Sequence, residues 1–260
     1  MIIVDKLCYY SKLRYTNAAE KFAFTILTLI ACIISRSIAV SILVLAVTGI
    51  LTVYKGRIPF SRYRSLMMVP AIFLLLSTMA ILVNISRTPL DAFAVPVGSY
   101  YITGSFAGLH RGIQLIFTAL ASVSCLYFLS LNTPMTDILD VLKKLHIPPL
   151  ILELMMLIYR YIFILMNLAS DITISQHSRL GNVNLKIARK SFADMISSVF
   201  ILSIRRSNEL YDAMESRCYD GTIQVLSENH PAKRREILLI AAFEIILYAI
   251  ILWQKRAGVF

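Results

Sequence analysis

The chain of 260 residues is 58% hydrophobic, has a mean hydropathy of +0.72 and carries a net charge of +11 at pH 7. This composition is too apolar for an ordinary soluble domain and indicates an integral membrane protein that contacts a lipid bilayer. The charge does not indicate a nucleic-acid partner, because the Lys and Arg residues lie between apolar runs, as membrane topology requires. The four cysteines form no CxxC pair, so neither a disulfide framework nor a zinc site is predicted.

Four apolar runs in the first half of the chain predict membrane-spanning helices. They cover residues 22–35, 38–54, 66–85 and 109–131. A spanning helix needs about 20 residues, so the first run is short and its beginning is left open. Residues 87–108 are rich in Pro and Gly and are predicted to form a loop on the far side of the membrane.

A fifth apolar run, residues 237–253, contains Glu244. An acid inside a span is a functional candidate because it is costly there, although a structural hydrogen bond explains it equally well. Cytoplasmic segments are enriched in Lys and Arg, which places the N-terminus, the basic loop 55–64 and residues 131–236 in the cytoplasm. We therefore expect a multi-pass protein of the cell inner (cytoplasmic) membrane. Its predicted regions are 1–131, 132–236 and 237–260.

The predicted cytoplasmic region alternates charge with long apolar stripes. Residues 135–145 predict an amphipathic helix that could lie on the membrane surface. Residues 151–169 predict a long apolar helix interrupted by Glu153 and Arg160, for which snorkelling or a structural ion pair is favoured over a direct role. This helix is expected to continue to a tip that carries Arg179.

The last long element of this region is predicted over residues 191–217. Its apolar residues recur at the spacing of one helical face. They are Phe192, Met195, Ile196, Val199, Phe200 and Ile204. Tyr219-Asp220-Gly221 is predicted to supply its end, with Gly221 able to adopt a left-handed conformation, so that the helix presents Arg217 at its tip.

Motifs for catalysis are absent from the sequence. There is no GxxxxGK[ST] phosphate loop, HExxH, GxSxG or metal-spaced Cys/His cluster, and the four histidines are scattered singly. No catalytic, metal-binding or cofactor-binding residue is therefore predicted. What remains is a pair of similar helix ends, Ser178-Arg179-Leu180 and Ser216-Arg217-Cys218. Arginine offers a rigid fork of donors to carboxylates and carbonyls in a socket, although spacing alone favours two solvated surface arginines.

At these residues the sequence resembles the transmembrane T component of energy-coupling-factor (ECF) transporters, in particular the cobalt-type CbiQ family. That family carries two Ala-Arg-Gly-like motifs at the ends of two cytoplasmic coupling helices, and the two arginine tripeptides occupy matching places. Ser stands where Ala is usual, and Leu180 and Cys218 replace the small third residue, so how closely the second helix end approaches its socket is left open. Further similarity lies in Asn17-Ala-Ala-Glu-Lys21, Thr133-Pro134 and Tyr159-Arg160-Tyr161.

The resemblance implies an all-α membrane protein with about five transmembrane helices and long cytoplasmic coupling helices. It also implies a non-catalytic subunit whose partners are two ABC-type ATPase subunits, which bind the ATP, and a small membrane substrate-binding component, with cobalt as the expected substrate. Arg179 and Arg217 would anchor the helix tips on the ATPases. Four methionines would suit a sliding surface for the substrate component, with ordinary helix packing as an equal alternative. They are Met155, Met156, Met166 and Met195.

Three other functions remain open at this stage. A shared T component for vitamin uptake would differ in its substrate-binding partner. A membrane scaffold without a transport role would have no ATPase partner and would leave the paired arginine tips unexplained. A membrane enzyme is disfavoured by the missing catalytic motifs. The substrate itself is not encoded in this chain if the resemblance holds, because the family places recognition on another subunit.

Overall fold

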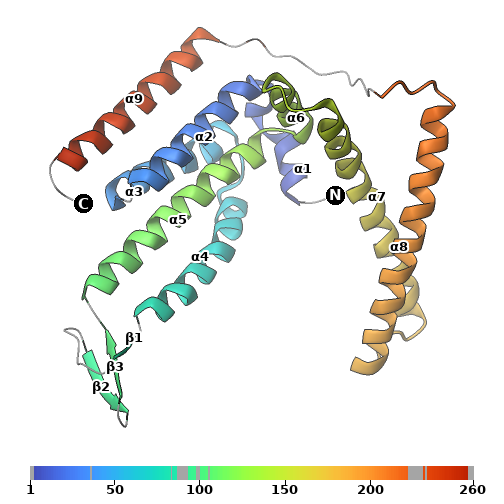
Figure 1. The fold of residues 1–260 in the computed structure, drawn as a ribbon, viewed down its shortest axis with the longest axis horizontal. Helices are drawn as coiled ribbons and strands as arrows, with labels where there is room; N and C mark the ends of the chain where they lie inside the picture. Colours follow the sequence, from blue (N-terminus) through green and yellow to red (C-terminus); the bar gives the residue numbers. More distant parts are fainter. Residues whose placement is uncertain are drawn as a thin grey trace. The chain divides into compact units, whose positions relative to one another are not determined.

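The computed structural model describes residues 3–35, 37–82, 84–86, 93–97, 100–104, 106–221, 231 and 233–256. The chain divides into two compact units. We name them the bundle unit, which comprises Ile2–Pro134 and Asn229–Phe260, and the hairpin unit, Met135–Glu228. Each is described by itself (Figure 1).

The bundle unit is built mainly from six helices in its described part. They are α1 (Ile3–Tyr10), α2 (Ala18–Ser35), α3 (Ile38–Ile50), α4 (Phe60–Leu82), α5 (Phe106–Asn132) and α9 (Arg234–Arg256). A short 3-10 segment, η1 (Lys12–Tyr15), and one π-helical turn, η2 (Leu51–Lys55), connect them. Helix α5 is central, because it packs against α1, α2, α3 and α4, while α9 packs on α2.

A small antiparallel sheet lies between α4 and α5, where the sequence predicts a loop. Its strands are β1 (Asn84–Ser86), β2 (Phe93–Val97) and β3 (Tyr100–Gly104), in the order β1-β3-β2. Helix α4 ends at Leu82, so the predicted end of the third span at residue 85 was wrong. Residues 87–92, 98, 99 and 105 of the predicted loop lie outside the described residues.

Small and polar side chains let the central helices of the bundle approach closely. The largest buried apolar cluster draws on α2, α3, α5 and α9, and its members include Ala31, Cys32, Val40, Val44, Ala121, Cys125, Leu247 and Ile251. A chain of hydroxyls joins α3, α4 and α5. Ser124 Oγ lies 2.6 Å from Thr48 Oγ1 and 2.7 Å from the Tyr63 hydroxyl. Paired hydroxyls suit a membrane interior, where an unsatisfied polar group is costly.

Lys21 fastens the start of α2 to the end of α5. Its side chain is only 5% exposed, and Nζ donates to the carbonyls of Leu13 and Asn132, each at 2.9 Å. Ser11 Oγ donates to Asn132 Oδ1 at 2.6 Å, so the same asparagine also binds the N-terminal segment. The bond to the Asn132 carbonyl gives a partner to a group at the end of α5, where a helix leaves its last carbonyls without intrahelical partners. These bonds explain in physical terms why a lysine stands at the predicted membrane edge.

Among the residues that the structure describes, five helical segments have the length and the apolar composition needed to cross a membrane. They are Ala18–Ser35, Ile38–Lys55, Gly108–Asn132, Pro149–Ser178 and Arg234–Gln254. Four of them match predicted spans. The fifth is α7 of the hairpin unit, whereas the span predicted over residues 66–85 falls largely in α4, which is not one of the five. The chain is an all-α integral membrane protein, with the small sheet as its minor β element. That α7 lies in the cytoplasm, as part of the region 132–236, stays a prediction.

Glu244 lies in α9 and is 6% exposed. Neither carboxylate oxygen has a hydrogen-bond partner among the described residues. The structural hydrogen bond considered for Glu244 is therefore not seen in this part of the chain.

Candidate functional site

The hairpin unit contains two long antiparallel helices. Its helices are α6 (Met135–Lys144), α7 (Pro149–Ser178) and α8 (Leu185–Glu215). Three contacts connect α7 to the α8 side from one end to the other: Thr173 to Met195, Tyr161 to Arg206, and Glu153 to Tyr219. The sequence numbers rise on one helix as they fall on the other, and the two helices cross (Figure 1). The predicted helix over residues 191–217 is found, but it begins earlier.

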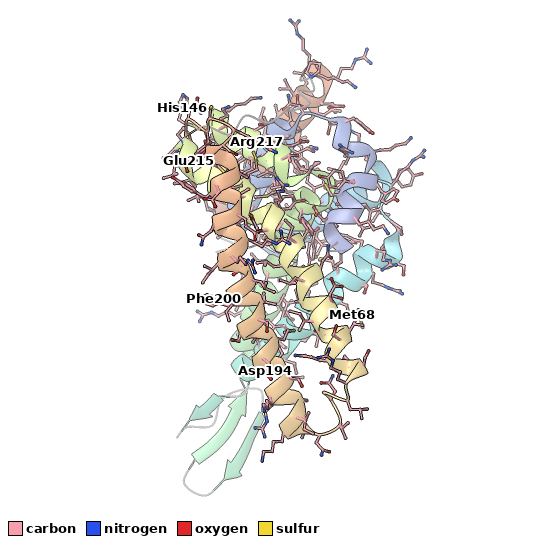
Figure 2. The ribbon with its side chains drawn as sticks, turned by 90° about the vertical axis from the view of Figure 1, so that its right-hand side faces the viewer. Met68, His146, Asp194, Phe200, Glu215 and Arg217 are labelled. Carbon is pink, nitrogen blue, oxygen red and sulfur yellow. The ribbon has the colours of Figure 1, made fainter. Side chains whose placement is uncertain are left out.

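The two arginine-bearing ends consequently lie at opposite ends of one hairpin. Arg179 caps α7 at the turn that leads into α8, whereas Arg217 follows the far end of α8. Helix α8 has 31 residues, which correspond to a length of about 46 Å at a rise of about 1.5 Å per residue. Figure 2 shows Asp194, Phe200 and Glu215 in succession along α8, with Arg217 beyond its end. A partner at one arginine is therefore well separated from a partner at the other.

The chain around Arg179 forms a Schellman turn. The Leu180 amide donates to the His177 carbonyl at 3.1 Å, and the Gly181 amide donates to the Gln176 carbonyl at 2.8 Å. This pair of bonds satisfies helix-end carbonyls and requires a left-handed residue after the cap. Leu180 fills that place with φ of 60°.

The chain around Arg217 makes the same turn. The Cys218 amide donates to the Glu215 carbonyl at 3.0 Å, and the Tyr219 amide donates to the Met214 carbonyl at 3.1 Å. Cys218 takes the left-handed place with φ of 57°. Gly221 is also left-handed, with φ of 91°, but the left-handed residue in the turn that ends α8 is Cys218.

The serines before the two arginines are bonded to their own helices. Ser178 Oγ donates to the Ile174 carbonyl at 3.0 Å, and Ser216 Oγ donates to the Ala213 carbonyl at 3.0 Å. Each hydroxyl is therefore satisfied locally. Arg179 and Arg217 are both exposed, and neither forms an ion pair within the described part of the chain. Both guanidinium groups are available to carboxylates or carbonyls of a partner.

The residue two places after each arginine is bonded to the neighbouring helix. At the first tip, Ser191 Oγ donates to the Gly181 carbonyl at 2.9 Å, and Gln176 Nε2 donates to the Ser191 carbonyl at 2.7 Å. A Cβ on Gly181 would lie 2.8 Å from the Gln176 carbonyl oxygen and 2.9 Å from Ser191 Oγ, so only glycine fits this close approach.

At the second tip, the Tyr219 hydroxyl donates to Glu153 Oε2 at 2.6 Å. Glu153 is 7% exposed. The hydrogen bond to the carboxylate raises the pKa of Tyr219, and the negative charges of Glu153 and Asp220 act in the same direction. Sequence reasoning missed this pair. The polar Glu153 within an apolar helix was the available signal, but its partner lies 66 residues away.

Comparison with known proteins identifies the chain's relatives. The model of the cobalt transport protein family CbiQ matches residues 11–227. The chain belongs to the CbiQ family. An uncharacterized protein of Methanocaldococcus jannaschii is 32% identical over 245 residues, which cover 94% of this chain and 91% of that protein. The cobalt transport protein CbiQ of Salmonella typhimurium is 27% identical over 219 residues, 84% of this chain and 97% of that protein.

The relatives extend to the energy-coupling-factor transporters. The transmembrane protein EcfT of Lactococcus lactis subsp. cremoris is 29% identical over 168 residues, which cover 60% of this chain and 63% of that protein. These findings confirm the resemblance and make this CbiQ-family chain a transmembrane transport component. The left-handed places of Leu180 and Cys218 also give a physical reason for the Gly expected third in each arginine motif, since glycine adopts that conformation without strain.

The side chains of the four methionines differ in their exposure to solvent. Met195 accepts a hydrogen bond from Thr173 Oγ1 at 3.2 Å and is half-buried in the hairpin. Met155 and Met156 are also half-buried, whereas Met166 is 47% exposed. For Met195, the contact fits ordinary packing between α7 and α8. A role for the four methionines at the surface of a membrane partner stays a prediction.

Proposed function

We propose that this CbiQ-family protein is the energy-coupling transmembrane subunit of an ECF-type ABC importer. Two ATPase subunits bind and hydrolyse ATP, and this chain transmits their motion to a small substrate-binding membrane subunit. The observation that carries the proposal is the pair of matching turns at opposite ends of one hairpin, each presenting an exposed arginine. One such turn is an ordinary helix end, but two at opposite ends of the same hairpin suit a pair of similar partners.

The hairpin geometry supports a mechanical mechanism. Each arginine tip docks in a groove on one ATPase subunit, where its guanidinium donates to carboxylates or carbonyls. When the ATPases close on ATP, the two docking grooves move relative to each other. Because the tips lie at opposite ends of a hairpin whose helices are about 45 Å long, this motion tilts α7 and α8. The exposed apolar side chains of both helices then carry the motion to the substrate-binding subunit.

Cobalt is the proposed substrate, because the family and the Salmonella relative carry cobalt transport in their names. The similarity to the energy-coupling-factor transporter proteins EcfT keeps a second candidate open, a shared T component for vitamin uptake. The two differ in the small membrane partner and not in this chain's tips. We further propose that the N-terminus and both tips face the cytoplasm, where the ATP is, in agreement with the distribution of basic residues.

Affinity purification from the native membrane in mild detergent tests the proposal. Wild type should bring with it an ABC-type ATPase and a small hydrophobic protein, identified by mass spectrometry. The Arg179→Ala/Arg217→Ala double variant should lose the ATPase and keep the small membrane protein. Uptake of radioactive Co²⁺ into cells should fall with the ATPase.

Arg205→Ala/Arg206→Ala is the matched control. It removes the same charge from α8, at side chains that are 76% and 63% exposed and pair with Glu209. It should retain the ATPase. Absence of an ATPase from the wild-type sample would instead support the membrane scaffold. A vitamin-binding subunit in place of a cobalt-type one would support the shared T component.

A further inference from the structure

We propose that Tyr219 and Glu153 are positioning residues, which hold the Arg217 tip at a fixed place against the start of α7. The inference rests on the proposed function, because it concerns how force applied at this tip reaches the rest of the hairpin. It assigns a role to two residues outside the arginine motifs. We call the hydrogen bond between Tyr219 and Glu153 the latch. The latch must be intact if a motion of the Arg217 tip is to move α7.

Tyr219 is held at both of its ends. Its backbone amide donates to the Met214 carbonyl of α8 at 3.1 Å, while its hydroxyl donates to Glu153 Oε2 of α7 at 2.6 Å. Arg217 lies two residues before it, inside the same turn. A displacement of Arg217 therefore either moves α7 with it or breaks one of these two bonds.

The bond to Glu153 is of a strong kind. A hydroxyl donating to a carboxylate at about 2.5–2.7 Å forms a charge-assisted hydrogen bond, stronger than a neutral one. Glu153 is buried, and a buried carboxylate requires donors to offset its loss of hydration. Tyr219, by contrast, is 37% exposed, so burial of its ring is not what places it here. The geometry therefore points to the hydroxyl as the part of Tyr219 that matters.

The other tip shows what the latch adds. At the corresponding place after Arg179 stands Gly181, which has no side chain, and its bonds to Ser191 and Gln176 stay within the tight turn between α7 and α8. The turn itself keeps the Arg179 tip beside α8. The Arg217 tip has no such turn to the neighbouring helix, and Tyr219 supplies the connection through a side chain. Loss of the tyrosine hydroxyl should therefore release only the Arg217 tip.

A distance measurement tests the latch in the full-length protein. Spin labels are placed at Leu150→Cys and Glu215→Cys on a Cys218→Ser background, while the other three cysteines are buried. The labels report the separation of the Arg217 tip from the start of α7. Tyr219→Phe should add a population at longer distance. Tyr211→Phe, which removes the same hydroxyl from an exposed tyrosine of α8, should leave the distribution unchanged.

A coupling measurement in the assembled transporter tests the consequence. Tyr219→Phe should lower the number of Co²⁺ ions taken up per ATP hydrolysed, while it still captures the ATPase, since Arg179 and Arg217 are intact. Glu153→Gln keeps an acceptor without the charge and should lie between wild type and Glu153→Ala. A purely structural role would lower uptake and ATPase capture together.

The proposed function and the latch can be refuted separately. If wild type captures no ATPase, the proposed function fails, and the distance measurement still decides whether the latch exists. If wild type and Tyr219→Phe give the same distance distribution, the latch is refuted whatever the partners are. If the distances change but the ratio of Co²⁺ to ATP does not, Tyr219 and Glu153 are not positioning residues for coupling.

Discussion

Leu180 and Cys218 occupy the same place in two copies of one turn, each directly after an exposed arginine, with φ of 60° and 57°. A left-handed backbone crowds the Cβ of any residue except glycine. The chain therefore accepts strain at both tips. Arg57 and His146 are left-handed as well, so the strained turn is not particular to the tips. What the two tips share is this turn with an exposed arginine directly before the left-handed residue.

Replacing either residue by glycine should stabilise its tip. The left-handed conformation costs roughly 1–2 kcal/mol for a residue with a Cβ, and a glycine removes this strain. Glycine also raises the conformational entropy of the unfolded chain, which offsets part of the stabilisation. Leu180→Gly or Cys218→Gly should therefore slow amide hydrogen exchange in the adjoining last turn by about 0.5–1 kcal/mol of local stability. Leu180→Ala keeps the Cβ and should not reproduce the gain. Equal gains from Ala and Gly would contradict the strain argument.

Single arginine variants should give partial complexes. The tips lie at opposite ends of the hairpin, so each binds its own ATPase under the proposed function. Arg179→Ala and Arg217→Ala should each leave one ATPase subunit on the transporter where wild type has two, as counted by native mass spectrometry. Loss of both subunits from either single variant would show that the two docking sites are cooperative and not independent.

How much of this site could be predicted from sequence depends on how local each feature is. The apolar periodicity of α8 and the two arginine tips are read from neighbouring residues, and both were predicted. Contacts between distant residues were not. Glu153 and Tyr219 meet only after α7 and α8 fold back on each other, and Lys21 meets Asn132 across 111 residues.

Local rules also failed where a stronger constraint competed. Glycine is the usual left-handed residue at a helix end, so Tyr219-Asp220-Gly221 was predicted to supply the end of α8, with Gly221 as its left-handed residue. The hydrogen bonds of the turn place Cys218 there instead. The sheet between α4 and α5 was missed for a similar reason. Its strands are three to five residues long and carry prolines and glycines nearby, so their composition indicated a loop.

The bond between Tyr219 and Glu153 should respond to alkaline pH. Because the carboxylate accepts a hydrogen bond from the protonated phenol, the pKa of Tyr219 is raised in the folded protein above the value of about 10 for an unfolded chain. The stabilisation that this hydrogen bond gives to the folded protein is thus fully present below about pH 10. It is lost as the pH rises through the raised pKa of Tyr219.

Difference spectra isolate this titration among the 13 tyrosines. The tyrosinate absorbance of wild type minus that of Tyr219→Phe reports one residue, and its midpoint should lie above about 10. The same difference spectrum on a Glu153→Gln background should titrate at lower pH, because the negative charge has been removed. A midpoint that ignores the Glu153 substitution would show that the pair is not bonded in solution.

Replacing Glu244 by an apolar residue should stabilise the folded protein. The buried carboxyl group of Glu244 has no hydrogen-bond partner among the described residues, and a buried polar group without a partner costs about 1–3 kcal/mol. Glu244→Met has a similar shape and no polar atoms to leave unsatisfied, so it should raise the thermal unfolding temperature of the isolated protein in detergent. Glu244→Gln retains an unsatisfied polar group and should raise it less. A lower unfolding temperature for Glu244→Met would mean that the carboxyl group has a stabilising partner in the folded protein, and the assignment of Glu244 as an unsatisfied acid would be withdrawn.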